Sequence, residues 1–477
     1  MRAAQPRRRC RRKSGMQASG AAASRPAGST CSPSSRRASI SPTSSPMEDD
    51  DLLMEILLRL PPRPSSLPRV STVCKRWRRI VADPQFFRRF CAHHREHPIV
   101  GVFFNSSLVE PPFRSTLDPP DLIPPELFSL RLDGIEGGDG GIWSIHSCRH
   151  GRVLFICSDR TGRGCRHVLV WDPVTGDRRC IGSPPQLDGH DWSGSHVQAD
   201  VLCVAGDKGH VHGACHSSPF KVVLACVSKG VAYACVYSSE MGAWADLIST
   251  MVPFDTPSSL GSRSMLLGNS LYWFLFGPQM GILELNFDRQ SLAVIEVPPD
   301  ACVANHQGLF LSTLGGTLGF IVVSESYRAQ LWDRTTNFDC VAGWMPGRTF
   351  ELRKLLPLKS GEWIKRVMFI AGDDNVAFLS TSRGIFMVHL ESLQFEEIFK
   401  SNPDCWLSTI YPYPFKSFFA AAGVSVASKC SGSGGSVFSL KPQDKVIVSQ
   451  EVYCQPSVIT TRTLPCGNQR NYSSMTS

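Results

Sequence analysis

The sequence predicts an α+β multidomain chain, in which a small N-terminal three-helix unit precedes an all-β propeller of six or seven blades. Two observations lead to this fold class. Apolar residues recur at helical spacing between residues 52 and 90. From residue 143 to residue 400, short apolar strands and polar turns recur in units of roughly forty to fifty residues. The spacing changes from helical to strand-like after Pro98, which marks the boundary between the two parts.

The first predicted helix carries one apolar stripe, formed by Leu52, Leu53, Ile56, Leu57 and Leu60. Four acidic residues, 48–51, precede this stripe, where the helix dipole favours negative charge. Two consecutive prolines, Pro61 and Pro62, then end the helix because proline cannot continue its hydrogen-bond pattern.

Two further helices are predicted before residue 92. The second carries an apolar series at similar spacing: Leu67, Val70, Val73, Cys74, Trp77, Ile80 and Val81. Asp83 followed by Pro84 is typical of a helix start and opens a third helix with Phe86, Phe87 and Phe90. Three short helices bury too little apolar surface to be stable alone, so we expect a partner surface to complete them.

This segment resembles an F-box, the helical motif that docks substrate receptors onto the Skp adaptor of cullin-RING ubiquitin ligases. The resemblance rests on Asp50-Asp51-Leu52-Leu53, Glu55-Ile56-Leu57, Arg59-Leu60-Pro61 and Val73-Cys74-Lys75-Arg76-Trp77-Arg78. One departure is that many F-boxes have Leu-Pro before the paired acids, where this chain has Glu48-Asp49. The alternative is an ordinary three-helix bundle that uses the same residues as its own core.

The resemblance implies an adaptor-binding surface and a set of partners. The implied adaptor-binding residues are Leu52, Leu53, Ile56, Leu57, Leu60, Pro61, Val70, Val73, Cys74 and Trp77. The implied partners are a Skp-type adaptor, through it a cullin and a RING subunit, and an unknown target protein. We expect residues 47–92 to form the F-box and residues 97–420 to form the propeller.

The basic residues are concentrated before the F-box. Residues 1–46 contain ten Lys or Arg and no acid, so the overall net charge of +9 leaves 40 basic against 41 acidic residues, a net of −1, for the remainder. A nearly neutral body argues against broad nucleic-acid binding. The composition of residues 1–46 predicts disorder. Residues 7–13 are compatible with a nuclear localisation signal or a phosphate-binding patch. Residues 1–46 as a whole are compatible with an organelle transit peptide. Alternatively, translation begins at Met47. We expect the protein in the nucleus, the cytoplasm or both.

Five repeat units predict blades: residues 151–185, 222–247, 270–299, 318–344 and 375–399. Residues 99–142 and 186–221 are expected to supply one or two more. The turn Trp171-Asp172-Pro173-Val174-Thr175-Gly176 and the strand containing Tyr272-Trp273 resemble the propeller that follows the F-box in a large plant F-box group. Residues 421–477 are predicted to be mostly disordered, with a single strand expected at 445–453.

No membrane span is predicted, since the longest uncharged stretch, residues 264–283, contains turn signals at 268–270 and 277–278 and is interpreted as strand–turn–strand. The eighteen cysteines include no C-x-x-C pair and are expected to be mostly buried thiols. No nucleic-acid or membrane partner is expected.

The sharpest candidate for a cofactor is a zinc cluster of His210, His212, Cys215 and His216. Structural zinc normally needs two separated ligand pairs, and no second pair is apparent, so a turn between blades is preferred and neither a metal nor another cofactor is predicted. The glycine-rich residues 137–141 are interpreted as a flexible loop, and Glu396-Glu397 as part of a strand.

No catalytic residue is predicted, because the chain lacks the common nucleophile, phosphate-loop, zinc-protease and dinucleotide motifs. The predicted function is that of a substrate-recognition subunit of an SCF-type (Skp–cullin–F-box) E3 ubiquitin ligase. Two alternatives stay open: a propeller-based enzyme or small-ligand binder, and an F-box protein without a degradation role.

Overall fold

The structure is a computed structural model of the 477-residue chain. It describes residues 49–94, 98–105, 112–130, 132, 141–159, 164–187, 197–204, 212, 215–216, 218–253, 259–277, 279–298, 306–312, 316–336, 342–371, 376–400 and 411–418. The expected disordered ends, the strand at 445–453 and most of the glycine-rich loop lie outside these residues.

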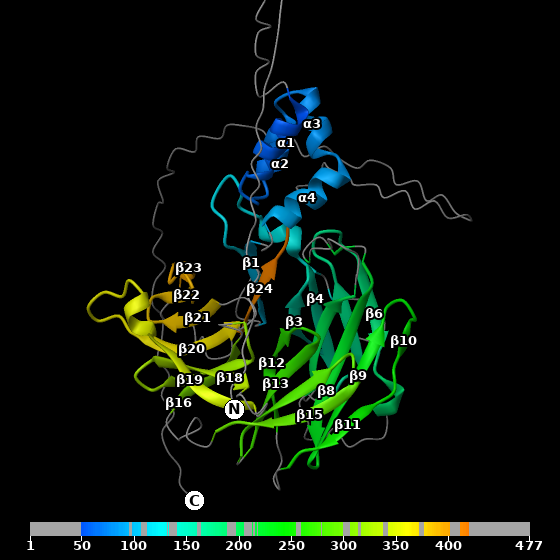
Figure 1. Ribbon diagram of the computed structural model, residues 1–477, viewed down its shortest axis with the longest axis vertical. Helices are drawn as coiled ribbons and strands as arrows, with labels where there is room; N and C mark the ends of the chain where they lie inside the picture. The colour runs from blue at the N-terminus through cyan, green and yellow to red at the C-terminus, as the bar shows by residue number, and fades with distance from the viewer. Residues whose placement is uncertain are drawn as a thin grey trace, which may run out of the picture. The chain divides into compact units, whose positions relative to one another are not determined.

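Four short helices come first (Figure 1): α1 (Asp50–Leu58), α2 (Ser66–Ser71), α3 (Lys75–Val81) and α4 (Pro84–His94). The prediction of three helices was wrong, because the second apolar series is divided between α2 and α3. The Thr72 hydroxyl donates to the Arg69 carbonyl at 2.7 Å, and the Cys74 sulfur accepts from the Trp77 amide at 3.5 Å. These bonds end α2 and cap α3, so the chain turns between the two helices.

The predicted start of the last helix is confirmed. The Asp83 carboxylate accepts from the Gln85 amide at 2.8 Å, directly before Pro84 begins α4. A carboxylate at this position satisfies an amide that has no partner within the helix.

The core of the helices includes one residue from far along the chain. Leu53, Leu57, Ile80 and Phe90 are among the buried members of this cluster, and Phe418 joins them with 5% of its surface exposed. The rings of Phe90 and Phe418 lie 6.3 Å apart. The expectation that a further surface completes the helices is therefore met in part by the chain itself, some 330 residues downstream.

Five antiparallel sheets follow. The first two are β3 (Ile142–Arg149), β4 (Arg152–Ser158), β5 (His167–Trp171) and β6 (Arg178–Gly182), then β7 (Gln198–Cys203), β8 (Phe220–Ser228), β9 (Val231–Ser238) and β10 (Ala243–Trp244), with β11 (Ile248–Met251) also pairing with β9. The third is β12 (Ser259–Leu267), β13 (Ser270–Phe276), β14 (Gly281–Asn286) and β15 (Ser291–Glu296). The last two are β16 (His306–Ser312), β17 (Gly319–Ser324), β18 (Arg328–Thr336) and β19 (Ala342–Glu351), then β20 (Ile364–Ala371), β21 (Val376–Thr381), β22 (Gly384–His389) and β23 (Phe395–Lys400).

The sixth sheet joins the two ends of the propeller. It has the order β2–β1–β24 and consists of β1 (Ile99–Asn105), β2 (Phe113–Ser115) and β24 (Tyr411–Lys416). β24 pairs with β1 from Ile99–Lys416 to Asn105–Tyr411. The described residues thus form a propeller of six blades, and residues 99–142 contribute to the sixth (Figure 1).

The six blades form a closed ring. The first strands of the five four- or five-stranded sheets, together with β24 of the sixth sheet, form a ring of neighbours. Their order is β3, β7, β12, β16, β20, β24 and again β3. Apolar clusters fill the spaces between successive blades; one such cluster joins Ala225 of β8 to Trp273 of β13, and another joins Val102 of β1 to Phe378 of β21. Burial between blades is what makes individually unstable sheets stable together.

The five predicted repeat units match the second to fourth strands of the blades that begin with β3, β7, β12, β16 and β20. Residues 186–221 were expected to help form an extra blade, but the strands among their described residues are β7, the first strand of the second blade, and the start of β8. The strand–turn–strand interpretation of residues 264–283 is confirmed by β12, β13 and the beginning of β14. In the described part of the chain, no helix is both long and apolar enough to cross a membrane.

Gly101 allows the closing sheet to form. A Cβ atom at this position would collide with the Phe113 ring and lie 2.6 Å from the Arg114 carbonyl oxygen. We expect Gly101→Ala to lower the free energy of unfolding by about 1–3 kcal/mol, since overpacking forces neighbouring atoms apart. Urea denaturation measures this change. Gly182→Ala in β6 is the matched control, because its Cβ would meet nothing within 4 Å. Equal destabilisation by both substitutions would contradict this account of the closure.

Glu396 lies in β23, as the sequence predicts, and partial burial together with the nearby Asp118 raises the pKa of its carboxyl to about 7. The neutral acid is thus preferred in the folded state. Stability from this group is present below its ordinary pKa of 4.5 and is lost as the pH rises toward 7. We expect Glu396→Gln to melt at the same temperature as wild type at pH 4.5 and at a higher temperature at pH 8. A melting difference that is constant over this range would contradict the assignment.

Candidate functional site

The exposed apolar surface of the helices is the first candidate site. Leu52 is 49% exposed, Ile56 39% and Val73 59%, and Cys74 beside Val73 is also exposed. We call these four residues the docking strip. Large apolar side chains left in water on a small helical unit are typical of a surface that a partner covers.

The other predicted adaptor-binding residues divide into two groups. Leu53, Leu57 and Val70 are buried in the helical core, with exposed fractions of 0%, 2% and 8%. Leu60 and Trp77 are half-buried, and Pro61 is exposed. The buried residues shape the surface by holding the helices together, whereas the docking strip is accessible in the chain as described.

Ion pairs fix α1 against its neighbours. The Asp50 carboxylate accepts from the Arg76 guanidinium at 2.6 Å and lies 3.6 Å from Arg79, both in α3. Glu55 pairs with Arg89 of α4 at 3.0 Å. These pairs are exposed and individually weak, but they set the angle at which α1 and α3 present the docking strip.

The departure at residues 48–49 acquires a structural role. The Asp49 side chain accepts from the Asp51 amide at 2.9 Å and caps α1, and Glu48 lies outside the described residues. The acid at position 49 therefore stabilises the helix start by a capping bond. The sequence analysis placed these acids at the helix start because of the helix dipole and did not predict the capping bond.

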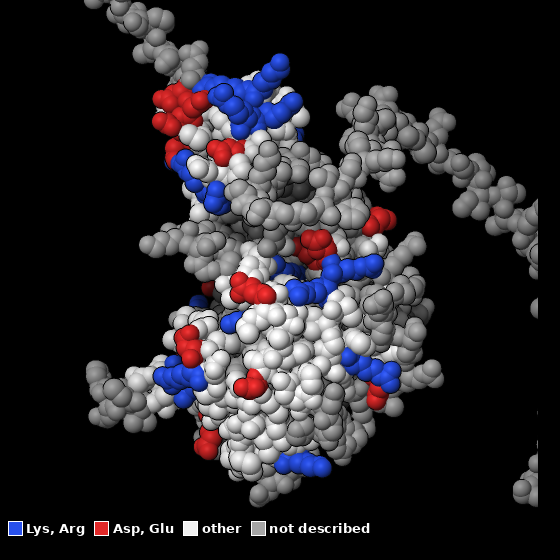
Figure 2. All heavy atoms as spheres, turned by 90° about the vertical axis from the view of Figure 1, so that its right-hand side faces the viewer, with Lys and Arg blue, Asp and Glu red and all other residues white. Residues whose placement is uncertain are grey.

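Charge is concentrated on the helical unit. Between residues 49 and 94 there are nine Lys or Arg and five Asp or Glu, and α3 alone contains Lys75, Arg76, Arg78 and Arg79. In Figure 2 basic side chains gather over the helices next to an acidic group, whereas much of the propeller face in this view carries no charge. The docking strip is thus bordered by positive charge.

The propeller axis holds a polar group that joins three blades. Asp200 of β7 is 1% exposed and accepts from the hydroxyls of Ser147 and Ser264. It also pairs with Arg149 of β3 at 3.2 Å. An enzyme at the axis would need convergent ionisable groups, and the carboxylate and guanidinium that converge here bind each other and the neighbouring strands. This arrangement favours a structural role for the group.

A polar cavity of about 470 Å³ lies between the first two blades. Its lining includes Arg178 and Arg179 of β6, Glu240 and the pair formed by Asp172 and His216, whose Oδ2 and Nδ1 atoms lie 2.8 Å apart. Arg152 also lines it and donates to the carbonyls of Cys215 and Ser218 at 2.5 and 2.6 Å. Both signs of charge are present, which suits a polar peptide or side chain better than a purely apolar ligand.

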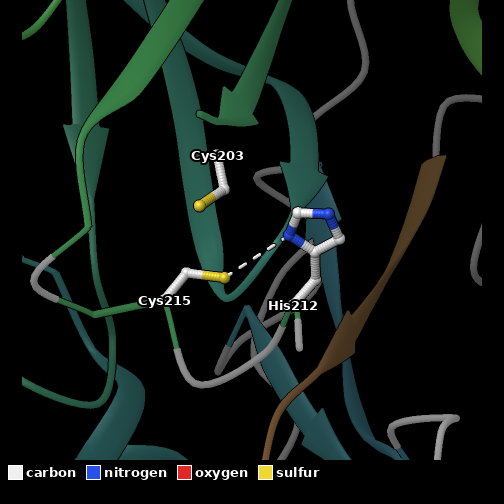
Figure 3. A group of neighbouring side chains, drawn as sticks. All are labelled: Cys203, His212 and Cys215. Carbon is white, nitrogen blue, oxygen red and sulfur yellow. Dashed lines mark hydrogen bonds between the residues drawn. The ribbon is translucent and has the colours of Figure 1, made fainter. Parts of the chain in front are cut away.

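The four residues considered as a zinc cluster and set aside in favour of a turn do not come together as a group. His216 is bonded to Asp172, and His210 lies outside the described residues. His212 and Cys215 do meet, and Cys203 at the end of β7 joins them (Figure 3). The segment that carries these residues connects β7 to β8 within one blade, so its prediction as a turn between blades was wrong. Cys203 was missed because it is nine residues from His212, although its place at the end of an apolar strand was a usable signal.

The cysteine prediction can be compared with the described residues. Ten cysteines there are thiols without a disulfide; Cys91, Cys157, Cys215, Cys226 and Cys235 are buried, and Cys74 and Cys180 are exposed. Burial raises the pKa of Cys91 to about 12 and that of Cys235 to about 11. Such thiols are poor nucleophiles.

Two protein-family models match the chain, one over the helices and one over the propeller. An F-box-like family model matches residues 50–93. A second model, described as F-box protein AT5G49610-like, beta-propeller, matches residues 144–416, which is more than half of the chain.

Three curated proteins of Arabidopsis thaliana are similar to the chain. A putative F-box/kelch-repeat protein is 29% identical over 148 residues, which cover 30% of this chain and 34% of that protein. An F-box/kelch-repeat protein is 27% identical over 56% of this chain and 64% of its own length. A putative F-box protein is 25% identical over 60% of this chain and 73% of its own length. The chain thus spans less than two thirds of the first two relatives.

Proposed function

We propose that this chain, which belongs to the F-box proteins with an AT5G49610-like β-propeller, is the substrate-recognition subunit of an SCF-type E3 ubiquitin ligase. The observation that carries the proposal is the docking strip, an exposed apolar surface on the segment that matches the F-box-like model. A Skp-type adaptor is the partner that this segment implies, and through it a cullin and a RING subunit.

The mode of docking follows from the geometry of α1 and α3. Leu52 and Ile56 are one helical turn apart on α1, and Val73 and Cys74 lie directly before α3. Such a pattern suits a partner with an apolar groove, into which helical side chains insert. The basic residues of α3 favour a partner with acidic groups at the rim of that groove, which would accelerate association at low salt.

The propeller is proposed to hold the target protein. Binding residues are commonly carried on loops, and the polar cavity between the first two blades offers groups for hydrogen bonds and ion pairs. Transfer of ubiquitin then belongs to the other subunits of the ligase, and this chain contributes proximity rather than a catalytic residue. We place this activity in the nucleus, the cytoplasm or both.

Two alternatives differ in what they require of the chain. A propeller enzyme or small-ligand binder requires reactive groups at the axis, where Asp200 and Arg149 are instead engaged with each other. An F-box protein without a degradation role requires adaptor binding but no loss of a bound target. The experiments below separate these possibilities.

Ile56→Asp tests adaptor docking. Ile56 is 39% exposed, so the folded helices should tolerate aspartate there, whereas an apolar groove on the adaptor should not. We expect affinity for the adaptor to fall about 10- to 100-fold, equivalent to about 1.4–2.8 kcal/mol. Titration of the purified full chain with the adaptor measures this change.

Leu127→Asp is the matched control, since Leu127 is 58% exposed outside the helical unit and should leave adaptor binding unchanged. Leu57→Asp should also abolish binding, but it would do so by unfolding the helices, because Leu57 is 2% exposed. Full adaptor affinity in a folded Ile56→Asp variant would rule out the docking strip as the contact.

Affinity purification from plant cells tests the degradation role. We expect the wild-type chain to recover the adaptor and the cullin, and to recover a ubiquitinated protein that accumulates when the proteasome is inhibited. Ile56→Asp should lose the adaptor and the cullin, and should keep the propeller-bound protein without its ubiquitin. A propeller-bound protein whose amount changes neither with the proteasome inhibitor nor with Ile56→Asp would favour an F-box protein without a degradation role.

A further inference from the structure

We propose that Cys203, His212 and Cys215 form a zinc-binding site, with two thiolates and one imidazole as ligands and a water molecule in the fourth position. The site is additional to the proposed function, which assigns no metal to the chain. It rests on three side chains whose possible ligand atoms all lie within 4.8 Å of one another.

The spacing of these atoms suits a tetrahedral metal. Zinc lies about 2.3 Å from a thiolate sulfur and about 2.0–2.1 Å from an imidazole nitrogen, so tetrahedral angles place sulfur and nitrogen about 3.5 Å apart. The Cys215 sulfur and the His212 Nδ1 atom are 3.6 Å apart. Figure 3 shows the Cys215 sulfur directed toward the Nδ1 edge of the His212 ring, with the Cys203 sulfur beside them.

The pairing of β7 with β8 brings the ligands close together. Cys203 is the last residue of β7 and pairs with Phe220, the first residue of β8. Cys215 lies five residues before β8, and the side chains of Cys215 and His212 both lie close to that of Cys203. The end of β7 thus supplies the position of Cys203, and residues before β8 supply His212 and Cys215.

Neighbouring groups hold two of the ligands. His150, in the turn after β3, accepts from the Cys203 amide through Nδ1 at 2.9 Å. Its ring also stacks on His212, with 3.8 Å between the centroids and 14° between the planes. Groups that orient metal ligands in this way commonly raise metal affinity.

Arg152 contacts the backbone of one ligand. Its guanidinium is almost entirely buried and donates to the carbonyl of Cys215 itself, at 2.5 Å. This bond holds the backbone at Cys215 in place, and two thiolates with one neutral imidazole give a zinc complex with no net charge. No described acidic side chain belongs to the cluster, which disfavours magnesium and calcium.

The three ligands differ in their exposure to solvent, and this difference predicts that the fourth coordination position of the zinc faces water. Cys215 is buried, Cys203 is partly buried and His212 is exposed, so the metal would lie at the surface with one side toward water. Three protein ligands and a water are typical of zinc sites that can exchange a ligand. Zinc here would also fix the segment that includes His216, Ser218 and Phe220, which line the polar cavity.

Cobalt titration of the reduced full chain tests the site, because Co²⁺ reports both thiolate ligation and tetrahedral geometry by its absorption. We expect one equivalent of Co²⁺ per chain, with a thiolate-to-cobalt charge-transfer band, and displacement by one equivalent of Zn²⁺. Affinity should weaken as the pH falls, since the thiols must lose protons to bind.

Substitutions identify the ligands. Cys203→Ser and His212→Ala should each lower cobalt affinity at least tenfold, and His150→Ala should lower it about 10- to 100-fold by releasing the ligands it orients. Cys180→Ser is the matched control, because Cys180 is an exposed thiol in β6 outside the cluster. The Cys180→Ser variant should still bind one equivalent of Co²⁺ per chain. Circular dichroism verifies that each variant is folded, and the exposed position of His212 makes His212→Ala the decisive one.

Three results would overturn the site: no thiolate-to-cobalt band in the wild-type chain, equal cobalt affinity in wild type and folded His212→Ala, or a Cys203–Cys215 disulfide that persists under reducing conditions. The site is independent of the ubiquitin-ligase role. The Ile56→Asp variant should bind cobalt normally, so loss of adaptor docking and loss of metal are distinguishable.

Discussion

The pairing of β24 with β1 is the interaction on which the rest of the structure depends. Six sheets can bury their apolar faces only if each has two neighbours, and the last sheet has its second neighbour only when the two ends of the propeller join. Tyr413 of β24 reinforces the join, because its hydroxyl donates to the Ile145 carbonyl of β3 at 2.5 Å. Closure also removes sheet edges that would otherwise pair with other chains.

The same junction connects the propeller to the helices. α4 leads toward β1, and Phe418, two residues after β24, packs into the helical core. The amide of Ser65 further donates to the Asp121 carboxylate at 2.7 Å. The helical unit that presents the docking strip therefore draws part of its stability from the two ends of the propeller. The helical unit and the propeller are joined by contacts as well as by the chain.

Much of this architecture could be predicted from the sequence, and the failures have physical causes. The family, the helical unit and the propeller were correctly predicted, because apolar periodicity and the turn after Trp171 are local signals. The first strands β3, β7, β16 and β20 lie outside the predicted repeat units, whereas β12 was part of the predicted strand–turn–strand of residues 264–283. First strands face the axis, and β3 and β7 carry polar residues such as Ser147 and Asp200, which interrupt the apolar pattern. β7 is further concealed because the segment that joins it to β8 is long.

For the candidate sites too, local spacing could be read from the sequence, whereas contacts that depend on the fold could not. Spacing identified Leu52 and Ile56 but could not separate them from the buried Leu53 and Leu57, since all four share one stripe and only packing against α3 and α4 decides exposure. The meeting of Cys203 with Cys215 could not be found either, because it depends on the register between β7 and β8. Register is fixed by the whole sheet rather than by residues near either cysteine.

The distance along the chain between β1 and β24 has a consequence for biosynthesis. Ile99 leaves the ribosome more than 300 residues before its partner Lys416. At about 5–20 residues per second, β1 waits about 15–60 s with one edge unpaired, long after the helices have been made. During this interval the nascent chain exposes a strand rich in valine and phenylalanine, and we expect it to require a chaperone until the last blade is complete.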